Sequence, residues 1–249
     1  MYGWKGRIGL LVPSRNTTME PEFNRLIPHG VSAHAARMVL KETSPTALMQ
    51  MEREVYRAAS VITAVNPDVI VVGCTSGSFI KGLGYDQEMM KKIKRLTQTP
   101  ALTTSTAVIE ALRLLQVKKV AVATPYTEAV NEREKEFIEA HGIQVAAIMG
   151  LGYSTPRKSY PLAAKPVSLI GLLEPSVAYK LAMEVDTKDA DGLFISCTNF
   201  RTVEIIEALE KNAGKPVVTS NQATLAMALK MLGVREKIKG FGVLLEGSF

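Results

Sequence analysis

The chain has 249 residues, of which 47% are hydrophobic and 22% are charged, and its formal net charge at pH 7 is +6. This composition is typical of a folded globular protein and excludes a disordered chain, and no apolar run approaches the ~20 residues that a membrane-spanning helix needs. The positive charge is spread along the chain without interleaved aromatic residues, so we expect no nucleic-acid partner and a small anionic substrate.

The first residues lead directly into a predicted strand. They lack the apolar segment and cleavage site of a signal peptide, so we expect a cytoplasmic protein that is not held at a membrane. In that compartment the two cysteines of the chain are expected to be free thiols.

The first half of the chain alternates predicted strands and helices. Strands are predicted over residues 5–12, 31–39 and 68–72, and helices over residues 44–65, 86–96 and 106–115. The helix at 44–65 has Ser44 as its expected N-cap. A loop of small polar residues follows the first strand, and it includes Ser14 and Asn16. Such a loop is either a turn that caps a helix or part of a binding site.

The second half repeats this order. Strands are predicted over residues 119–123, 143–149, 191–195 and 240–245, and helices over residues 127–140, 175–185, 202–212 and 223–232. Tyr126 takes the place after its strand that Ser14 takes in the first half. The long irregular stretch 150–168 is either a lid over an anion or a plain surface loop.

The two cysteines occupy matching places in this repeat. Residues 68–76 read Asp-Val-Ile-Val-Val-Gly-Cys-Thr-Ser, and residues 191–199 read Asp-Gly-Leu-Phe-Ile-Ser-Cys-Thr-Asn. Apolar runs of this kind predict strands buried on both faces of a parallel sheet. Cys74 and Cys197 therefore stand at the carboxyl ends of strands, where open α/β sheets bind ligands. The repeat predicts an α/β fold of two similar parallel-sheet domains.

Several of these segments resemble the aspartate/glutamate racemase superfamily, and within it the branch of maleate cis-trans isomerases and arylmalonate decarboxylases. The segments are residues 13–20, 73–76, 105–108 and 130–133, Tyr126, and residues 197–199. The resemblance implies two flavodoxin-like domains related by a pseudo-twofold axis, with the active site in the cleft between them. It also implies a homodimer that uses no cofactor and no metal. We expect the first domain to comprise residues 1–105 and 222–249, and the second to comprise residues 106–221.

The resemblance also implies roles for individual residues. Cys74 would be the nucleophile and Cys197 the acid of a maleate isomerase. The residues expected to hold the substrate are Ser14, Asn16, Thr75, Ser76, Tyr126, Thr198 and Asn199. Decarboxylases of this branch have a glycine in place of Cys74. The isomerases have a serine in place of Arg15, and they carry a substrate-binding asparagine in the loop that corresponds to 150–168, where this chain has none.

Thiol chemistry explains why an isomerase needs such residues. A thiolate that adds to a cis alkene turns the double bond into a single bond that can rotate, and hydroxyl and N–H donors stabilise the charge that develops on the far carboxylate. A helical turn after Cys74 is expected to lower the pKa of its thiol. The same pair suits a racemase that moves a proton between two faces of an α-carbon. Decarboxylation of a malonate, plain diacid binding, and two buried structural cysteines remain alternatives.

Overall fold

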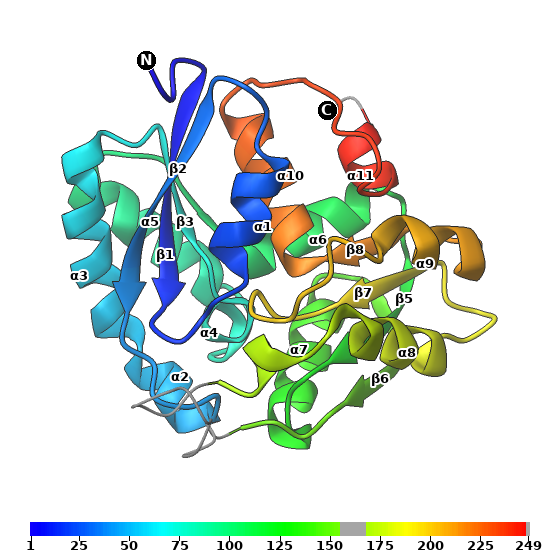
Figure 1. The fold of residues 1–249 in the computed structure, drawn as a ribbon. Coiled ribbons are helices and arrows are strands. Elements are labelled where there is room, and N and C mark those ends of the chain that lie inside the picture. The colour runs from blue at the N-terminus through cyan, green and yellow to red at the C-terminus, as the bar shows by residue number, and fades with distance from the viewer. Residues whose placement is uncertain (155–167, 248–249) are drawn as a thin grey trace.

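The computed structural model describes residues 1–154 and 168–247, and its strands form two four-stranded parallel sheets (Figure 1). The first sheet comprises β1 (Gly6–Pro13), β2 (Val31–Met38), β3 (Val69–Val72) and β4 (Ala101–Thr103). The second comprises β5 (Lys119–Thr124), β6 (Gln144–Gly150), β7 (Gly192–Ile195) and β8 (Val217–Thr219). The strand orders are β2-β1-β3-β4 and β6-β5-β7-β8. The two sheets thus share one topology, which confirms the predicted α/β fold with two similar domains.

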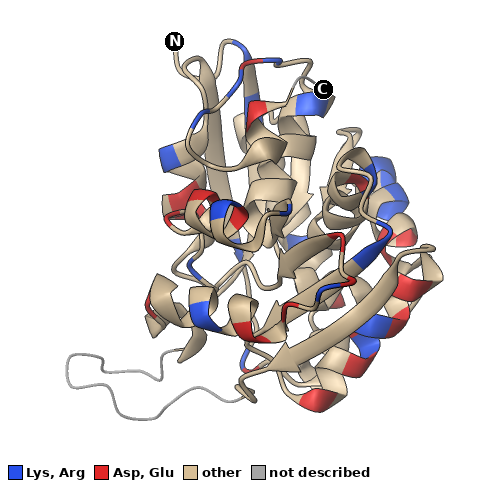
Figure 2. Cartoon of the chain, turned by 90° about the vertical axis from the view of Figure 1, so that its right-hand side faces the viewer, with Lys and Arg blue, Asp and Glu red and all other residues tan. Residues whose placement is uncertain are grey.

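Helices connect and cover the strands. In the first half they are α1 (Met19–Leu26), α2 (Pro45–Gln50), α3 (Glu52–Ile62), the 3-10 turn η1 (Thr63–Val65), α4 (Thr75–Phe79), α5 (Tyr85–Thr97) and α6 (Thr104–Leu114). In the second half they are α7 (Glu128–Ala140), the 3-10 turn η2 (Ile170–Leu172), α8 (Pro175–Val185), α9 (Ile206–Ala213), α10 (Ser220–Met231) and α11 (Val243–Glu246). Lysines, arginines and acidic residues are distributed over helices and loops around the molecule (Figure 2).

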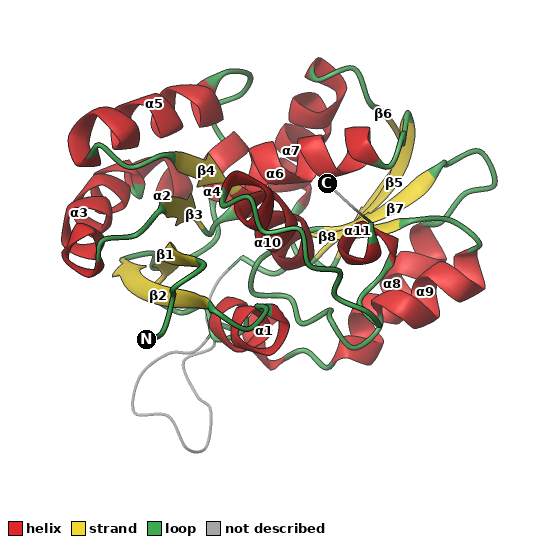
Figure 3. Ribbon diagram, turned by 90° about the horizontal axis from the view of Figure 1, so that it is seen from above, coloured by secondary structure: helices red, strands yellow, loops and turns green. Residues whose placement is uncertain are grey.

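The central strands β3 and β7 are buried along their whole length, as expected for strands covered on both faces. The helices α6 and α10 pack against each other between the two sheets (Figure 3). Every residue of α10 from Ser220 to Leu229 is buried, because this helix contacts elements of both halves. Thr103 and Thr219 cap α6 and α10 in the same way, each accepting a hydrogen bond from the backbone N–H three residues on. The duplication therefore extends to the helix caps, while the proposed domain boundaries stay a prediction.

One predicted strand is wrong. Residues 240–245 do not form a strand, and α11 begins at Val243 instead. Gly240 and Gly242 have φ of +83° and +88°, left-handed values that interrupt an extended backbone. Leu244 and Leu245 are both buried, as consecutive residues of a short helix can be, and α11 packs on α10 and β8.

Two predicted helices differ from the structure by more than three residues at a boundary or by an interruption. The helix expected over 44–65 is interrupted at Met51, which ends α2 and precedes α3, while Ser44 is the N-cap as predicted. The helix expected from residue 202 begins at Ile206, and the N–H groups of Thr202 and Val203 ahead of it donate to the Glu22 side chain. Of the stretch 150–168, expected to be either a lid or a plain surface loop, residues 155–167 lie outside the described residues. No helix in the described ranges is long and apolar enough to cross a membrane.

Candidate active site

A pocket lies where the carboxyl ends of the central strands of the two sheets meet. Its walls come from the loops that follow β1, β2, β3, β5, β6 and β7, and from η2. The lining residues are Pro13, Arg15, Asn16, Leu40, Lys41, Glu42, Thr43, Cys74, Thr75, Ser76, Tyr126, Tyr153, Ser154, Ser168, Leu169, Ile170, Cys197, Thr198 and Asn199. The structure thus brings both cysteines to one pocket, although they are far apart in the chain.

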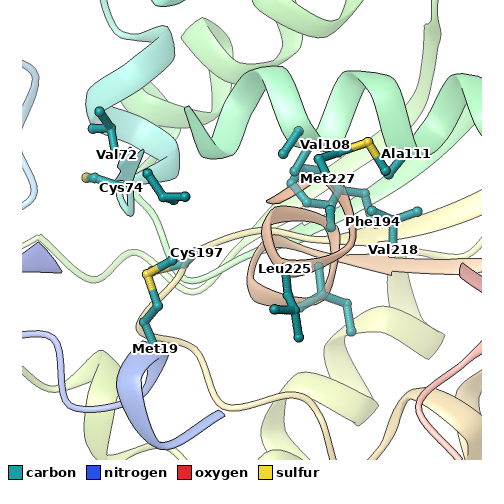
Figure 4. Close-up of a cluster of buried hydrophobic side chains, with 14 of the residues drawn as sticks. Met19, Val72, Cys74, Val108, Ala111, Phe194, Cys197, Val218, Leu225 and Met227 are labelled. Carbon is teal, nitrogen blue, oxygen red and sulfur yellow. The ribbon is translucent and has the colours of Figure 1, made fainter. Parts of the chain in front are cut away.

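Strand register shows that the two cysteines are equivalent. Leu11 pairs with Val72 in the first sheet, and Ala123 pairs with Ile195 in the second. Each cysteine follows its central strand by two residues. By the same register Ser14 and Tyr126 occupy equivalent positions, as predicted from the sequence. In Figure 4 Cys74 and Cys197 lie at one end of the buried cluster, away from the part between α6 and α10.

The backbone breaks this symmetry at the second cysteine. Cys74 is extended, with φ of −146°, and leads directly into α4. Cys197 has φ of +99°, a conformation that non-glycine residues rarely adopt and that costs on the order of 1–3 kcal/mol. It is fixed by its N–H, which donates to Ser220 Oγ at 3.0 Å, and by its carbonyl, which accepts from Phe200 N at 3.1 Å.

The same Ser220 hydroxyl also accepts from Thr75 Oγ1 at 2.9 Å. One side chain at the start of α10 therefore ties together the loops that carry the two cysteines.

Ser14 is the only predicted site residue that does not line the pocket. Its hydroxyl accepts from the N–H of Leu40 at 3.2 Å and donates to the carbonyl of the same residue at 3.4 Å. It therefore anchors the loop after β2, while the larger Tyr126 reaches the pocket from the equivalent position. Arg15, Lys41 and Thr43 line the pocket but were missed in the sequence. Lys41 and Thr43 follow the predicted strand at 31–39. Residues just after the carboxyl end of a strand are expected at the ligand site of such a sheet, so the same argument that applied to the cysteines could have identified these two residues.

Asn16 binds the start of α1 and also lines the pocket. Its Oδ1 accepts from the N–H groups of Thr18 and Met19, at 2.9 and 3.0 Å, where α1 begins. Its Nδ2 donates to Thr198 Oγ1 across the pocket at 2.9 Å, and the Thr198 hydroxyl donates to the carbonyl of Gly73 at 3.0 Å. Asn16 and Thr198 thus join the two halves of the molecule beside the cysteines.

Asn199 makes a second set of bonds between the halves. Its Oδ1 accepts from Thr17 N at 2.9 Å and from Thr18 Oγ1 at 3.2 Å, and its Nδ2 donates to Ser168 Oγ at 3.2 Å. These contacts hold the side chain in place at the wall of the pocket.

A buried carboxyl group supports the loop after Cys197 from behind. Glu22 of α1 accepts from the N–H groups of Thr202 and Val203 at 2.8 and 3.2 Å, and from Asn221 Nδ2 at 2.5 Å. Asn221 in turn donates to the carbonyl of Thr198 at 3.0 Å. Burial raises the pKa of Glu22 to about 7, although these hydrogen bonds oppose the shift.

Backbone donors in the pocket remain available to a ligand. Within the described ranges, the N–H groups of Thr75, Ser76 and Thr198 donate to no protein acceptor. Two of them belong to the first turn of α4, where N–H groups lack helical partners. Together with Arg15 and Lys41 at the wall, they give the pocket several donors for a negatively charged group.

Both thiols are protonated at neutral pH, and this corrects the expectation for Cys74. Burial raises the pKa of Cys74, and the Ser76 hydroxyl and the Gly77 N–H only oppose that shift. Burial raises the pKa of Cys197 to about 12, and a negative charge on Cys74 is a further cause of that increase. A negative charge on Cys74 therefore favours the protonated form of Cys197.

Tyr126 lies against the second thiol. Its side chain is buried, which raises the pKa of the phenol well above the usual value, so it remains a hydrogen-bond donor. Its hydroxyl lowers the pKa of Cys197 by hydrogen bonding. Among the described residues, no group of histidine, cysteine, aspartate and glutamate side chains is placed to hold a metal ion.

Comparisons with known proteins agree with this geometry. The family model described as arylmalonate decarboxylase matches residues 8–245. The chain is 28% identical over 256 residues to a maleate isomerase of Pseudomonas putida, and the match covers 98% of both chains. It is 28% identical over 243 residues to the arylmalonate decarboxylase of Bordetella bronchiseptica, with 97% of each covered.

A crystal structure of a Pseudomonas putida maleate isomerase variant with maleate has the same fold. It superimposes with a TM-score of 0.88 at 27% identity, over 97% of this chain and 98% of the other. Fold, strand order and sequence therefore lead to one conclusion, and the chain belongs to the arylmalonate decarboxylase family of the aspartate/glutamate racemase superfamily.

Proposed function

We propose that this protein is a cofactor-independent isomerase that converts maleate, or a similar small cis-dicarboxylate, to its trans isomer. The observation that carries the proposal is the pair of free cysteines at equivalent strand ends, both lining one pocket. The maleate isomerases among its relatives support the choice of reaction. The pair itself favours a reaction that uses two thiols over decarboxylation, for which one thiol would suffice.

In the proposed reaction Cys74 acts as the nucleophile. Cys74 first releases its proton to solvent. The resulting thiolate adds to one alkene carbon, and the electron pair of the double bond moves toward the far carboxylate. The N–H groups of Thr75 and Ser76 and the Ser76 hydroxyl stabilise that charge, because they are fixed donors in a buried site. Cys197 then gives its proton to the other carbon, which leaves a saturated adduct on Cys74.

The adduct rotates about its new single bond. The Cys197 thiolate takes a proton back from the same carbon, the double bond re-forms in the trans arrangement, and Cys74 leaves as a thiolate. The coupling between the two thiols supports these roles, since a negative charge on Cys74 raises the pKa of Cys197 and so favours a protonated Cys197 when Cys74 attacks.

Two equivalent cysteines in one pocket also fit a racemase. In that reaction one thiolate removes an α-proton and the other thiol supplies one to the opposite face, without a covalent adduct. This second candidate predicts exchange of an α-proton with solvent, whereas the isomerase predicts an adduct on Cys74.

The test is proton NMR of maleate with the enzyme, together with intact-protein mass spectrometry after acid quench. We expect fumarate to accumulate and an adduct with the mass of the diacid to appear on the wild type. Cys74→Ser should form no adduct. If maleate is not consumed while an amino acid or hydantoin exchanges its α-proton in deuterated water, the racemase is correct. Binding of maleate without any turnover would indicate a diacid-binding protein.

We also propose that the protein is a homodimer, which light scattering after size-exclusion chromatography would test.

A further inference from the structure

A second buried carboxyl group, that of Glu134, lies behind Cys197 and takes no part in the steps above. Glu134 belongs to α7 and is 1% exposed. Its Oε1 accepts from the hydroxyl of Ser196 at 2.5 Å, and Ser196 directly precedes Cys197. The carboxyl group is therefore fixed relative to the residue that bears the strained backbone of the second cysteine.

The other oxygen of this carboxyl group is unsatisfied. Within the described residues Glu134 Oε2 has no hydrogen-bond partner. Glu134 also lines a small cavity. Among the described residues, the other polar residues that line this cavity are Thr75 and Ser105, and the rest are apolar. An ionised carboxylate is costly in such surroundings, so the group holds its proton unless the pH is high. Burial accordingly raises the pKa of Glu134 to about 8.

The charged groups around Glu134 are few. Of the elements packed against α7, neither α4 nor β6 carries a charged side chain, and Glu110 of the neighbouring α6 is paired with Arg113 at 2.9 Å near the surface. The other charged residues of α7 itself are exposed. The titratable groups that face Glu134 are those of the pocket, Tyr126 and Cys197, and a negative charge on Glu134 raises the pKa of both.

We propose that Glu134 is a positioning residue that stays neutral at neutral pH, and that its neutral form leaves Cys197 able to give up a proton during turnover. This inference rests on the proposed function, in which Cys197 is the acid. When Cys197 donates its proton it becomes a thiolate, and a second negative charge close by would oppose that step. Ionisation of Glu134 in alkaline solution should therefore weaken Cys197 as an acid and lower kcat.

The test measures the Cys197 thiol without any substrate, so that it is independent of the reaction that the enzyme catalyses. In a Cys74→Ala background Cys197 is the only cysteine, and the rate of its alkylation by iodoacetamide is followed between pH 6.5 and 9.5. Glu134→Gln, which keeps the shape and the neutral state, should label at the same rate as the background at pH 6.5. At pH 9.5 Cys197 in this variant should be alkylated about 3- to 10-fold faster than in the background. This difference is equivalent to a pKa of Cys197 that is lower by up to ~1 unit.

Glu132→Gln removes a charge from the exposed side of the same helix and is the matched control, with no expected change in labelling. Superimposable labelling profiles for Glu134→Gln and the background would overturn the proposal, whatever the substrate proves to be. If Glu134→Gln already labelled about 3- to 10-fold faster than the background at pH 6.5, the proposal would also be overturned, because Glu134 would then be ionised at that pH.

Ser196→Ala gives a second test that does not depend on the folding of a Glu134 variant. The Ser196 hydroxyl lowers the pKa of Glu134, so removing this hydroxyl should make Glu134 ionise at higher pH. The pH at which Cys197 begins to label more slowly than in Glu134→Gln should rise accordingly. An unchanged onset would contradict the proposal. In otherwise wild-type protein, the alkaline fall of kcat should shift upward in Ser196→Ala and disappear in Glu134→Gln.

Discussion

Replacement of Glu22 by glutamine should remove much of the pH dependence of stability below neutral pH. The pKa of Glu22 rises from an ordinary 4.5 to about 7 on folding. The folded state therefore binds more protons than the unfolded state in this window, so stability is complete below pH 4.5 and falls as the pH rises toward 7. At ~1.4 kcal/mol per pKa unit, the loss is on the order of 3 kcal/mol.

Glutamine preserves most of the local contacts. Its carbonyl oxygen can still accept from the N–H groups of Thr202 and Val203. Its amide would meet Asn221 Nδ2. A flip that presents Asn221 Oδ1, which has no partner in the described part of the chain, restores this hydrogen bond but gives up the one from Asn221 Nδ2 to the carbonyl of Thr198. Glu22→Gln thus removes the charge. The altered hydrogen bonds cost about 1 kcal/mol of unfolding free energy, and this cost does not depend on pH.

The assay is urea unfolding followed by far-UV circular dichroism at pH 4.5, 6 and 7.5. Wild type should lose on the order of 3 kcal/mol more unfolding free energy across this range than Glu22→Gln. Glu132→Gln, an exposed carboxylate replaced in the same way, should follow the wild type. Equal slopes in wild type and Glu22→Gln would refute the reasoning, because they would mean that Glu22 titrates alike in the folded and unfolded states.

Three further predictions concern the pocket. Cys74→Ala and Cys197→Ala should each abolish turnover while circular dichroism and Tm stay close to wild type, and more than a few per cent of residual activity would remove that cysteine from the mechanism. Tyr126→Phe removes a donor that lowers the pKa of Cys197, so alkylation of Cys197 should slow and kcat should fall ~10- to 100-fold, and an unchanged kcat would exclude Tyr126 from the reaction. Thr198→Val breaks the bridge from Asn16, which should cost about 1–3 kcal/mol of stability and lower kcat, whereas wild-type values of both would show that the bridge has no role.

Much of this molecule could be read from local sequence patterns. Buried apolar runs predicted β3 and β7, and the matched Cys-Thr steps after them predicted two similar sheets with cysteines at equivalent ends. These features depend on residues that are adjacent in the chain. A buried strand of a parallel sheet is a continuous apolar run, and the loop that carries the cysteine comes directly after it in the sequence. The equivalence of Ser14 and Tyr126 came from the same alignment and is confirmed by strand register.

Side-chain roles depended on contacts between residues far apart in the chain. The sequence could not show that Ser14 turns away to bind Leu40, or that the side chains of Thr198 and Asn199 bind loops of the other half. Nor could it show that burial would raise the pKa of Cys74 rather than lower it. A pKa depends on the surrounding atoms and their exposure to water, and those are known only when the two sheets are packed together.

The sequence by itself therefore determined the duplicated α/β fold and placed each cysteine at the end of a central strand, because both follow from the periodicity of one short segment. Only the tertiary structure decided which polar groups surround the thiols. Glu22 and Glu134 carry no motif, and each acts on the loop of Cys197 from a different helix. Their importance comes from burial and from hydrogen bonds across the fold, for which local sequence has no signal.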